Sequence, residues 1–258
     1  MNVREIVAAR ELLLFLTWRD VKIRYKQTVL GVAWAVLQPL LMMMVFTVLF
    51  QRLGKIPTGD VPGPVFYYAA LLPWTFFASG LMNAGNSLIT NTDLLTKVYF
   101  PRPIIPAATV LAGLVDLAIA SALLLFLLPY YGLLPDLELL AWPIAIGLLM
   151  ALTLGGGMLV AAINVVYRDV KYALPFAIQL MMFVSPVIWS TETIPERFQL
   201  LWKLNPLSGI IEASRAALVP GKAVDWGHLG IAALVTACIV AAGITYFGRV
   251  ERRFADIV

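Results

Sequence analysis

The sequence is poor in the side chains that enzymes use for chemistry. It has one cysteine, Cys238, and one histidine, His228, among 258 residues. A single cysteine excludes an intramolecular disulfide and a cluster of thiolates around a metal, and a single histidine excludes paired-histidine chemistry within one chain. The apolar stretches also lack the paired carboxylates of acid–base catalysis. We therefore expect no catalytic residue and no metal site in this chain.

Motifs for nucleotide binding and hydrolysis are also missing. A phosphate-binding loop follows the pattern GxxxxGK[ST], in which backbone N–H groups hold the phosphates. Gly221 and Lys222 are followed by Ala223, and the earlier glycine position holds Ala216. The patterns GxSxG, HExxH and CxxC do not occur. We expect no cofactor in this chain, so a process driven by ATP would require a separate subunit.

Charge is scarce and apolar residues are abundant. Charged residues make up 13% of the chain and hydrophobic ones 61%, with a mean hydropathy of +0.87. Soluble domains carry about 25% charged residues. A basic segment beginning at Arg19 passes directly into an uncharged run from Gln27 to Gln51, and about 20 apolar residues suffice to cross a bilayer. The chain is therefore expected to be an integral membrane protein.

Uncharged runs separated by turn residues predict six membrane spans. They are Val29–Phe50, Pro64–Leu88, Pro103–Leu128, Leu139–Val166, Tyr172–Ser190 and Leu229–Gly248. An even number of spans places both termini on one side. Of the 19 lysines and arginines, 13 fall on that side and six on the other. Basic residues gather on the cytoplasmic side, so both termini are expected in the cytoplasm.

The N-terminal segment, residues 1–27, predicts an amphipathic helix on the cytoplasmic face of the membrane. Apolar positions recur at helical spacing between Val3 and Lys26, with basic residues between them. The basic residues Arg19, Lys22, Arg24 and Lys26 are expected to hold this helix against anionic lipid headgroups. A generic positively charged anchor is the alternative interpretation.

The connection between the second and third spans predicts a short helix. Asn91 to Asp93 can cap it, Asp93 and Lys97 are four residues apart, and Pro101 stops it. A short polar helix between two spans is a natural docking element for a cytoplasmic protein. An ordinary loop with one helical turn is the alternative.

The external segment, residues 191–227, contains two amphipathic stretches of 10 and 14 residues, PERFQLLWKL and NPLSGIIEASRAAL. They are too short to span a bilayer. Asn205 and Pro206 form a good N-cap and first-turn pair for the second stretch. Two half-helices that dip in from outside would form a gate, and two helices lying flat on the outer leaflet remain the alternative.

These features predict an all-α integral membrane protein with six transmembrane helices, an N-terminal amphipathic interface helix and two short re-entrant external helices. The whole chain, residues 1–258, is expected to form one transmembrane domain. Its parts are the interface helix (1–27), spans one to five (29–190), the external gate segment (191–227), span six (229–248) and a cytoplasmic tail (249–258).

Two spans combine aromatic rings with amides on one helical face. Phe176, Gln179 and Phe183 share a face of the fifth span, and Trp34 and Gln38 share one in the first. An amide beside aromatic rings is poorly suited to lipid, whereas sugars offer apolar ring faces for stacking and hydroxyls for the amide. We therefore predict a substrate path for sugars along these five residues. Ordinary interhelical packing with a glutamine hydrogen bond is an equal alternative for each residue alone.

Asp116 is the one ionisable residue deep within a predicted span. An intramembrane acid is costly, and a role in transport is the usual explanation. A lone acid can also be a hydrogen-bonded packing residue, because proton relays usually need more than one. Both roles remain open, with the structural one favoured.

Five segments resemble one family in their residues and in their order along the chain. These segments are RYKQTVLGVAWAVLQPL (Arg24–Leu40), LLTKVYFPRPIIP (Leu94–Pro106), NVVYRDVKY (Asn164–Tyr172), SPVIWSTETIP (Ser185–Pro195) and NPLSGIIEASR (Asn205–Arg215). They are similar to the membrane subunits of polysaccharide ABC exporters, the ABC-2 class permeases that export O-antigen, capsule or teichoic acid.

The resemblance implies a homodimer in a bacterial cytoplasmic (inner) membrane, bound to two copies of an ABC ATPase that carries ATP and magnesium. The substrate it implies is an undecaprenyl-diphosphate-linked polysaccharide such as O-antigen, with no nucleic acid as a partner. It implies a channel between the subunits, with the first and fifth spans prominent in its lining, and an external pair of gate helices. The family's coupling helix corresponds to Asn91–Tyr99, with Asn91, Asp93, Leu95, Lys97 and Tyr99 as expected ATPase-coupling residues.

Two other functions are weighed against this one. A drug or small-lipid ABC exporter would have a narrower and less aromatic pore. A membrane transferase acting on polyprenyl lipids would need a cluster of Asp, Glu or His at a membrane face to hold a metal-bound diphosphate. Asp93 and Asp169 stand without such a cluster. We therefore expect a transport subunit and no enzyme.

Overall fold

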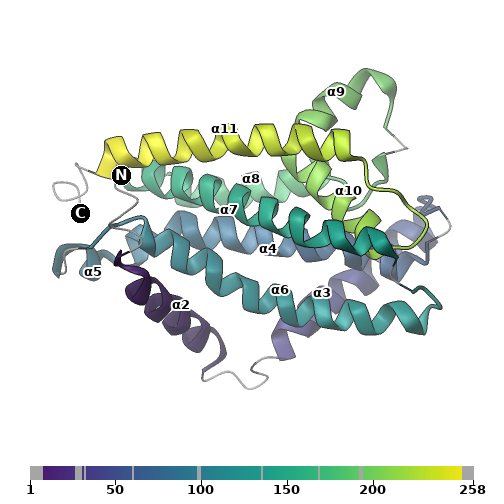
Figure 1. Ribbon diagram of the computed structural model, residues 1–258, viewed down its shortest axis with the longest axis horizontal. Helices are drawn as coiled ribbons and strands as arrows, with labels where there is room; N and C mark the ends of the chain where they lie inside the picture. Colours follow the sequence, from purple (N-terminus) through teal and green to yellow (C-terminus); the bar gives the residue numbers. More distant parts are fainter. Residues whose placement is uncertain are drawn as a thin grey trace.

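The computed structural model describes residues 8–26, 31, 33–59, 61–97, 100–134, 136–167, 169–191 and 194–251, with the backbone alone for residues 95–97. Every regular element within these residues is helical, which confirms the all-α prediction (Figure 1). The α-helices are α2 (Arg10–Tyr25), α3 (Ala33–Phe46), α4 (Gly63–Thr90), α5 (Thr92–Lys97), α6 (Ile104–Tyr130), α7 (Ala141–Val166), α8 (Val170–Val184), α9 (Glu196–Leu204), α10 (Pro206–Leu218) and α11 (Trp226–Val250). A π-helical segment, η1 (Thr47–Leu53), continues α3, and a 3₁₀ turn, η2 (Leu137–Leu140), precedes α7.

Five helices in the described part of the chain are long and apolar enough to cross a bilayer. They are α3 with η1 (21 residues), α4 (28), α6 (27), η2 with α7 (30) and α11 (25). At about 1.5 Å per residue, α4, α6, α7 and α11 each exceed the roughly 30 Å of a hydrocarbon core, and α3 with η1 about matches it. The chain is therefore an integral membrane protein.

The fifth predicted span differs from its prediction. The expected continuous segment to Ser190 is wrong, because α8 ends at Val184 after 15 residues. Ser185 is extended (φ −107°, ψ 155°), as expected for a residue before a proline, and Pro186 follows it. The chain then turns through Val187 and Ile188, whose side chains are fully buried. A shorter apolar helix and a buried turn therefore take the place of one long helix.

Helix α4 is the centre of the bundle. It packs against α3, α6, α7, α8 and α10, and its side chains from Val65 to Leu72 are buried without interruption. Tyr68 donates a hydrogen bond to the carbonyl of Ala120 in α6 at 3.0 Å, so its hydroxyl is satisfied inside the bundle. The first half of α4, which is apolar on all sides, is therefore surrounded by protein.

Helices α7 and α11 approach each other closely through glycines. A Cβ atom on Gly155 would lie 2.7 Å from Val240 Cα, and one on Gly243 would collide with the carbonyl oxygen of Gly155. Small residues at such crossings let two membrane helices come into backbone contact. The crossing therefore depends on the absence of a side chain at both glycines.

Gly243→Ala is expected to destabilise the protein by about 1–3 kcal/mol, because the added methyl meets backbone that cannot rotate away. Gly248→Ala, on the same helix, is the matched control, since a Cβ atom added there would meet no neighbouring element within 4 Å. Both changes gain the same helix propensity, so the difference between their thermal midpoints in detergent isolates the packing cost. Equal thermal midpoints for the two variants would show that α7 and α11 can move apart to admit the methyl group without loss of stability.

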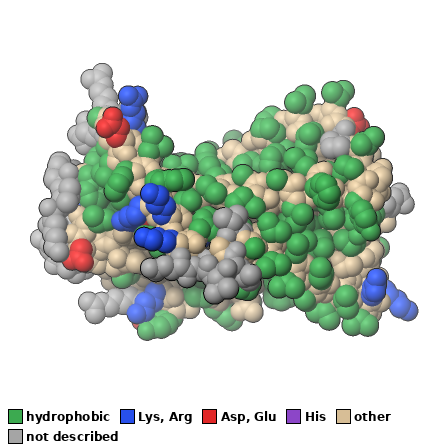
Figure 2. Space-filling model, turned by 90° about the horizontal axis from the view of Figure 1, so that it is seen from below, with side chains coloured by type: hydrophobic (Ala, Val, Ile, Leu, Met, Phe, Trp, Pro, Cys, Tyr) green, Lys and Arg blue, Asp and Glu red, His purple; other side chains and the backbone are tan. Residues whose placement is uncertain are grey.

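The two ends of the bundle carry different elements. Helix α5 and the start of α2 lie at one end, and α9 and α10 lie at the other (Figure 1). Arg102, just before α6, donates to the carbonyl of Glu251 at the end of α11, which ties the first end together. Seen from below, basic side chains and some acidic ones lie towards that end, and most of the remaining face is free of charge apart from a few charged side chains at the opposite end (Figure 2). This distribution fits a hydrophobic belt between two polar ends.

Candidate functional site

A cavity of about 220 Å³ lies between α2, α3, α4 and α6. Trp34 and Gln38, two of the five predicted path residues, line it from α3. Its polar lining is completed by Arg24, Tyr25, Thr75, Ser79 and Asp116, among mostly small and apolar residues. The cavity thus brings an aromatic ring, an amide, two hydroxyls and charged groups together within an apolar protein.

Packing of α3 explains why Trp34 and Gln38 face the cavity. The buried face of α3 is formed by Pro39, Met43 and Phe46, whereas Trp34 and Gln38 are exposed. The two residues are four apart, so they lie on one side of the helix. Their side chains are therefore available to a molecule in the cavity.

The hydroxyls of α4 present acceptors to the cavity. Thr75 Oγ1 donates to the carbonyl of Leu72 at 3.1 Å, and Ser79 Oγ donates to the carbonyl of Thr75 at 2.7 Å. A hydroxyl has one donor and two acceptor lone pairs. Because each donor is used within α4, each hydroxyl can still accept a hydrogen bond from a ligand.

Asp116 is held by two residues at the end of α2. Arg24 forms an ion pair with one of its carboxylate oxygens, and the Tyr25 hydroxyl donates to the other. Burial raises the pKa of Tyr25, and the charge of Arg24 opposes this shift, so the phenol keeps its proton as a donor. Asp116 is the sole carboxylate among the described residues that line the cavity. The arrangement is that of an ion pair with one added hydrogen bond rather than a proton relay.

The other three predicted path residues do not join this cavity. Helix α8 packs through Leu174 and Ile178, and Phe176, Gln179 and Phe183 lie on its opposite side. The side chains of Phe176 and Phe183 are 63% and 50% exposed. This aromatic face therefore points away from the subunit, and its role as a channel lining remains a prediction.

Helix α4 also carries a polar face that was not predicted from the sequence. Hydroxyl and amide side chains recur at Thr75, Ser79, Asn83, Asn86 and Thr90, and all five are at least partly exposed. Their spacing of three or four residues is the signal that could have revealed the face. Such a face is poorly suited to lipid tails, because they offer no hydrogen-bond partners. It runs for about 22 Å from the cavity towards the end of the bundle that carries α5.

The four predicted interface residues of α2 divide into two pairs. Lys22 and Lys26 are exposed, and the Lys22 ammonium lies 5.5 Å from the centre of the Trp18 ring. Arg19 and Arg24 instead turn towards partners within the protein. The first pair can reach lipid headgroups, whereas the second holds α2 to the bundle.

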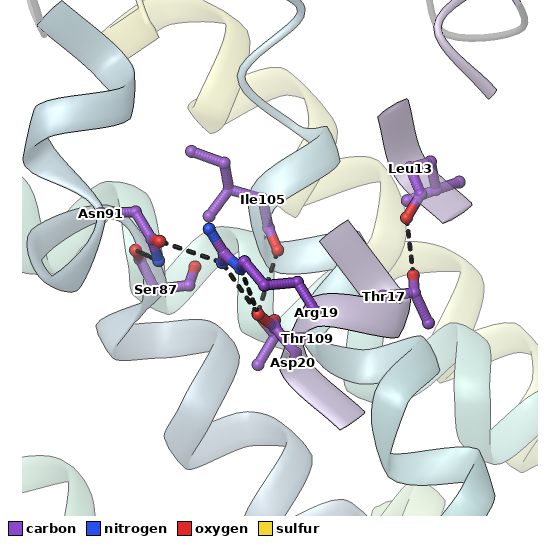
Figure 3. Close-up of polar contacts among 8 residues, drawn as sticks. All are labelled: Leu13, Thr17, Arg19, Asp20, Ser87, Asn91, Ile105 and Thr109. Atoms are coloured by element: carbon purple, nitrogen blue, oxygen red, sulfur yellow. Dashed lines mark hydrogen bonds and ion pairs between the residues drawn. The ribbon is translucent and has the colours of Figure 1, made fainter. Parts of the chain in front are cut away.

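Arg19 and Asp20 form a polar network between α2, α4 and α6 (Figure 3). Arg19 donates to the Asp20 carboxylate at 2.8 Å and to Asn91 Oδ1 at 3.1 Å. Thr109 of α6 lies 3.4 Å from the other carboxylate oxygen of Asp20 and donates to the carbonyl of Ile105. Helix α2 is thereby fixed at both the end of α4 and the start of α6.

The predicted coupling helix is present over Thr92–Lys97. Asn91 does not act as its side-chain cap, which corrects that prediction: Asn91 Nδ2 donates back to the Ser87 carbonyl of α4, and its Oδ1 accepts from Arg19. Asp93 is exposed in the first turn. Leu95 and Lys97 are described by their backbone alone, and Tyr99 lies outside the described residues.

The two predicted external helices differ in burial. Helix α9 has no buried residue, whereas α10 lies within the bundle against α4, α7 and α11. The predicted cap is confirmed, because Asn205 Oδ1 accepts from the backbone N–H of Leu207 at 3.1 Å and Pro206 is the first helical residue. Only α10 therefore enters the protein interior.

Arg215 on α10 is a second functional candidate, and it was not predicted from the sequence. Its side chain is fully buried and donates to Glu212 at 2.8 Å and to the carbonyl of Pro186 at 2.5 Å. The guanidinium also lies 3.9 Å from the ring centre of Phe66 in α4. Burial lowers the pKa of Arg215, and the Glu212 carboxylate opposes that shift. One residue thus joins α10, the turn after α8 and the start of α4.

Comparison with known proteins assigns the chain to a family. Residues 11–219 match the model of the ABC-2 type transporters. The chain is 30% identical to the O-antigen export system permease protein RfbA of Klebsiella pneumoniae, over 96% of this chain and 95% of that protein. It is 29% identical to the protein of the same name from Myxococcus xanthus, over 99% and 98% of the two chains. It is 27% identical to the polysialic acid transport protein KpsM of Escherichia coli, over 84% and 86%.

The family match covers the cavity, the polar face of α4, α5 and α10. The chain belongs to the ABC-2 type transporter family and is its membrane permease component.

Proposed function

We propose that this permease forms the channel of an ATP-driven exporter that moves a lipid-linked polysaccharide, O-antigen in the first instance, out across the bacterial cytoplasmic membrane. The observation that carries the proposal is the similarity, over at least 96% of this chain, to permeases named for O-antigen export. An undecaprenyl-diphosphate carrier is the corresponding lipid.

The cavity and the neighbouring polar face support a sugar as the substrate. Trp34 offers an apolar ring surface, and Gln38, Thr75 and Ser79 offer hydrogen-bonding groups. A carbohydrate presents both kinds of surface on one ring. A permease for apolar drugs would have no use for the hydroxyls and amides that continue along α4 to Thr90.

The outward aromatic face of α8 supports a homodimer. Phe176, Gln179 and Phe183 face away from the subunit, so a second copy would place two such faces opposite each other. The channel would then lie between the subunits, lined by α8 and by Trp34 and Gln38 of α3. Pairing also removes exposed aromatic rings and amides from contact with lipid.

The basic end of the bundle is assigned to the cytoplasm. It carries α2 and α5, towards which the basic residues gather (Figure 2). Two copies of an ABC ATPase, which bind ATP and magnesium, would dock on α5 and its symmetry mate. This permease would supply the path and the partner would supply the hydrolysis.

The proposal is tested by cysteine labelling in a complex of the permease with its ATPase, in a Cys238→Ser background. Gln38→Cys and Gln179→Cys are expected to react with a membrane-impermeant thiol reagent when ATP is hydrolysed, because an open channel admits water to both. Leu234→Cys is the control, since its side chain is 71% exposed on the apolar outer side of α11 and would face lipid.

Export by Trp34→Ala is expected to fall by up to about tenfold, because a lost aromatic contact is worth roughly 0.5–1.5 kcal/mol. Protection of Gln38→Cys and Gln179→Cys in every nucleotide state would show that these are packing residues. Export of a capsular polymer in place of O-antigen would change the substrate but not the mechanism.

A further inference from the structure

We propose that α2 is a strut that carries the movement of α5 to the substrate cavity, with Asp116 as the positioning residue that receives it. This inference rests on the proposed function, because it assumes that a partner moves α5. The strut is the 16-residue helix Arg10–Tyr25, about 24 Å long. Its two ends contact different functional parts of the permease.

The first end of the strut holds α5. Leu94 of α5 packs in a cluster with Leu12, Leu13 and Leu16 of α2 and with Ile104 of α6. Arg19, just past the middle of α2, adds the hydrogen bond to Asn91, the residue that directly precedes α5. A displacement of α5 therefore pushes on α2 through both apolar and polar contacts.

The far end of the strut reaches the cavity. Arg24 and Tyr25, the last two residues of α2, both contact Asp116 in the wall of the cavity. Gly31 and Trp34 follow within ten residues and line the same cavity. A shift of α2 along α6 would thus change the Asp116 contacts in the wall of the cavity.

The chemistry of the two ends suits a switch. The side chains of Arg24 and Asp116 are 29% and 30% exposed. Both groups line the cavity, so water in the cavity can solvate the two charges when the pair opens. The apolar contact of Leu16 with α6 is buried, and it keeps α2 attached to the bundle while the Arg24–Asp116 ion pair opens and closes. Packed side chains and an ion pair that has an open and a closed arrangement can carry energetic coupling between two sites.

The experiment uses the complex with its ATPase and the Gln38→Cys reporter in the Cys238→Ser background. In the parent complex, labelling of Gln38→Cys is expected to rise with ATP. Asp116→Asn is expected to abolish this rise, so that both nucleotide states label equally, while the partner continues to hydrolyse ATP. Exchange of the charges, Arg24→Asp with Asp116→Arg, is expected to restore it.

Asp136→Asn is the matched control, because Asp136 is an exposed carboxylate that caps η2 at the opposite end of the bundle. Tyr25→Phe removes one hydroxyl without changing charge and is expected to reduce the ATP-dependent rise in part. It keeps the test valid if Asp116→Asn lowers the yield of folded complex.

The outcomes separate the two proposals. A full ATP-dependent rise in both Asp116→Asn and Tyr25→Phe would overturn the strut and leave the proposed function standing. Loss of the rise that the exchanged charges do not restore would also overturn it, because the pair would then be structural only. If the parent complex shows no ATP-dependent change, the proposed function fails and the strut fails with it.

Discussion

Removal of the Glu212 carboxylate is expected to cost about 3–5 kcal/mol of stability, because it leaves the buried Arg215 guanidinium without its charge partner. Arg215 is enclosed by Phe66 and the Pro186 carbonyl, and its side chain is 1% exposed. Glu212→Ala should therefore release α10 from the turn after α8, and thermal unfolding in detergent measures the loss.

Arg215→Met is expected to cost less than Glu212→Ala. The Glu212 side chain is 20% exposed and lines a cavity of about 280 Å³, so its charge can be hydrated once the arginine is gone. The double variant Glu212→Ala/Arg215→Met is expected to recover most of the loss, because a buried ion pair is often replaceable by apolar groups. A melting curve of Glu212→Ala that matches the parent would show that the pair does not hold α10.

Leu95→Pro is expected to abolish export and the stimulation of the partner ATPase. Helix α5 has only six residues, and a proline at its fourth position removes a backbone hydrogen bond and forces the preceding residue away from helical geometry. The penalty of about 3 kcal/mol exceeds what so short a helix can recover from its own packing. ATP hydrolysis by the reconstituted complex, with and without polymer, measures the effect.

Leu95→Ala is the control for the proline variant, because it shortens the same side chain and keeps the helix. Both variants should insert into the membrane and elute as the parent does, since α5 lies at the end of the bundle rather than in its core (Figure 1). Normal stimulation by Leu95→Pro would remove α5 from the coupling path.

Local patterns in the sequence predicted most of the fold. Each long apolar run became a helix, because a chain in hydrocarbon must satisfy its backbone hydrogen bonds within one segment. The cap at Asn205 and the helix over Thr92–Lys97 were also predicted, since caps and short helices depend on neighbouring residues. The exception was the segment after Val184, where Pro186 ended the helix although hydrophobicity continued.

The sequence by itself determined that the chain is an integral membrane protein, that it is all helical, and which faces of α3 and α8 carry aromatic and amide groups. These properties follow from composition and periodicity, which are local to one helix. Only the tertiary structure decided that Arg24 pairs with Asp116, 92 residues away, and that Arg215 meets Pro186 and Phe66. Such partners come from different helices, and their meeting depends on the rotation and depth of each helix. Packing around α4 sets the rotation and the depth of each helix, and the periodicity of a single helix does not determine either of them.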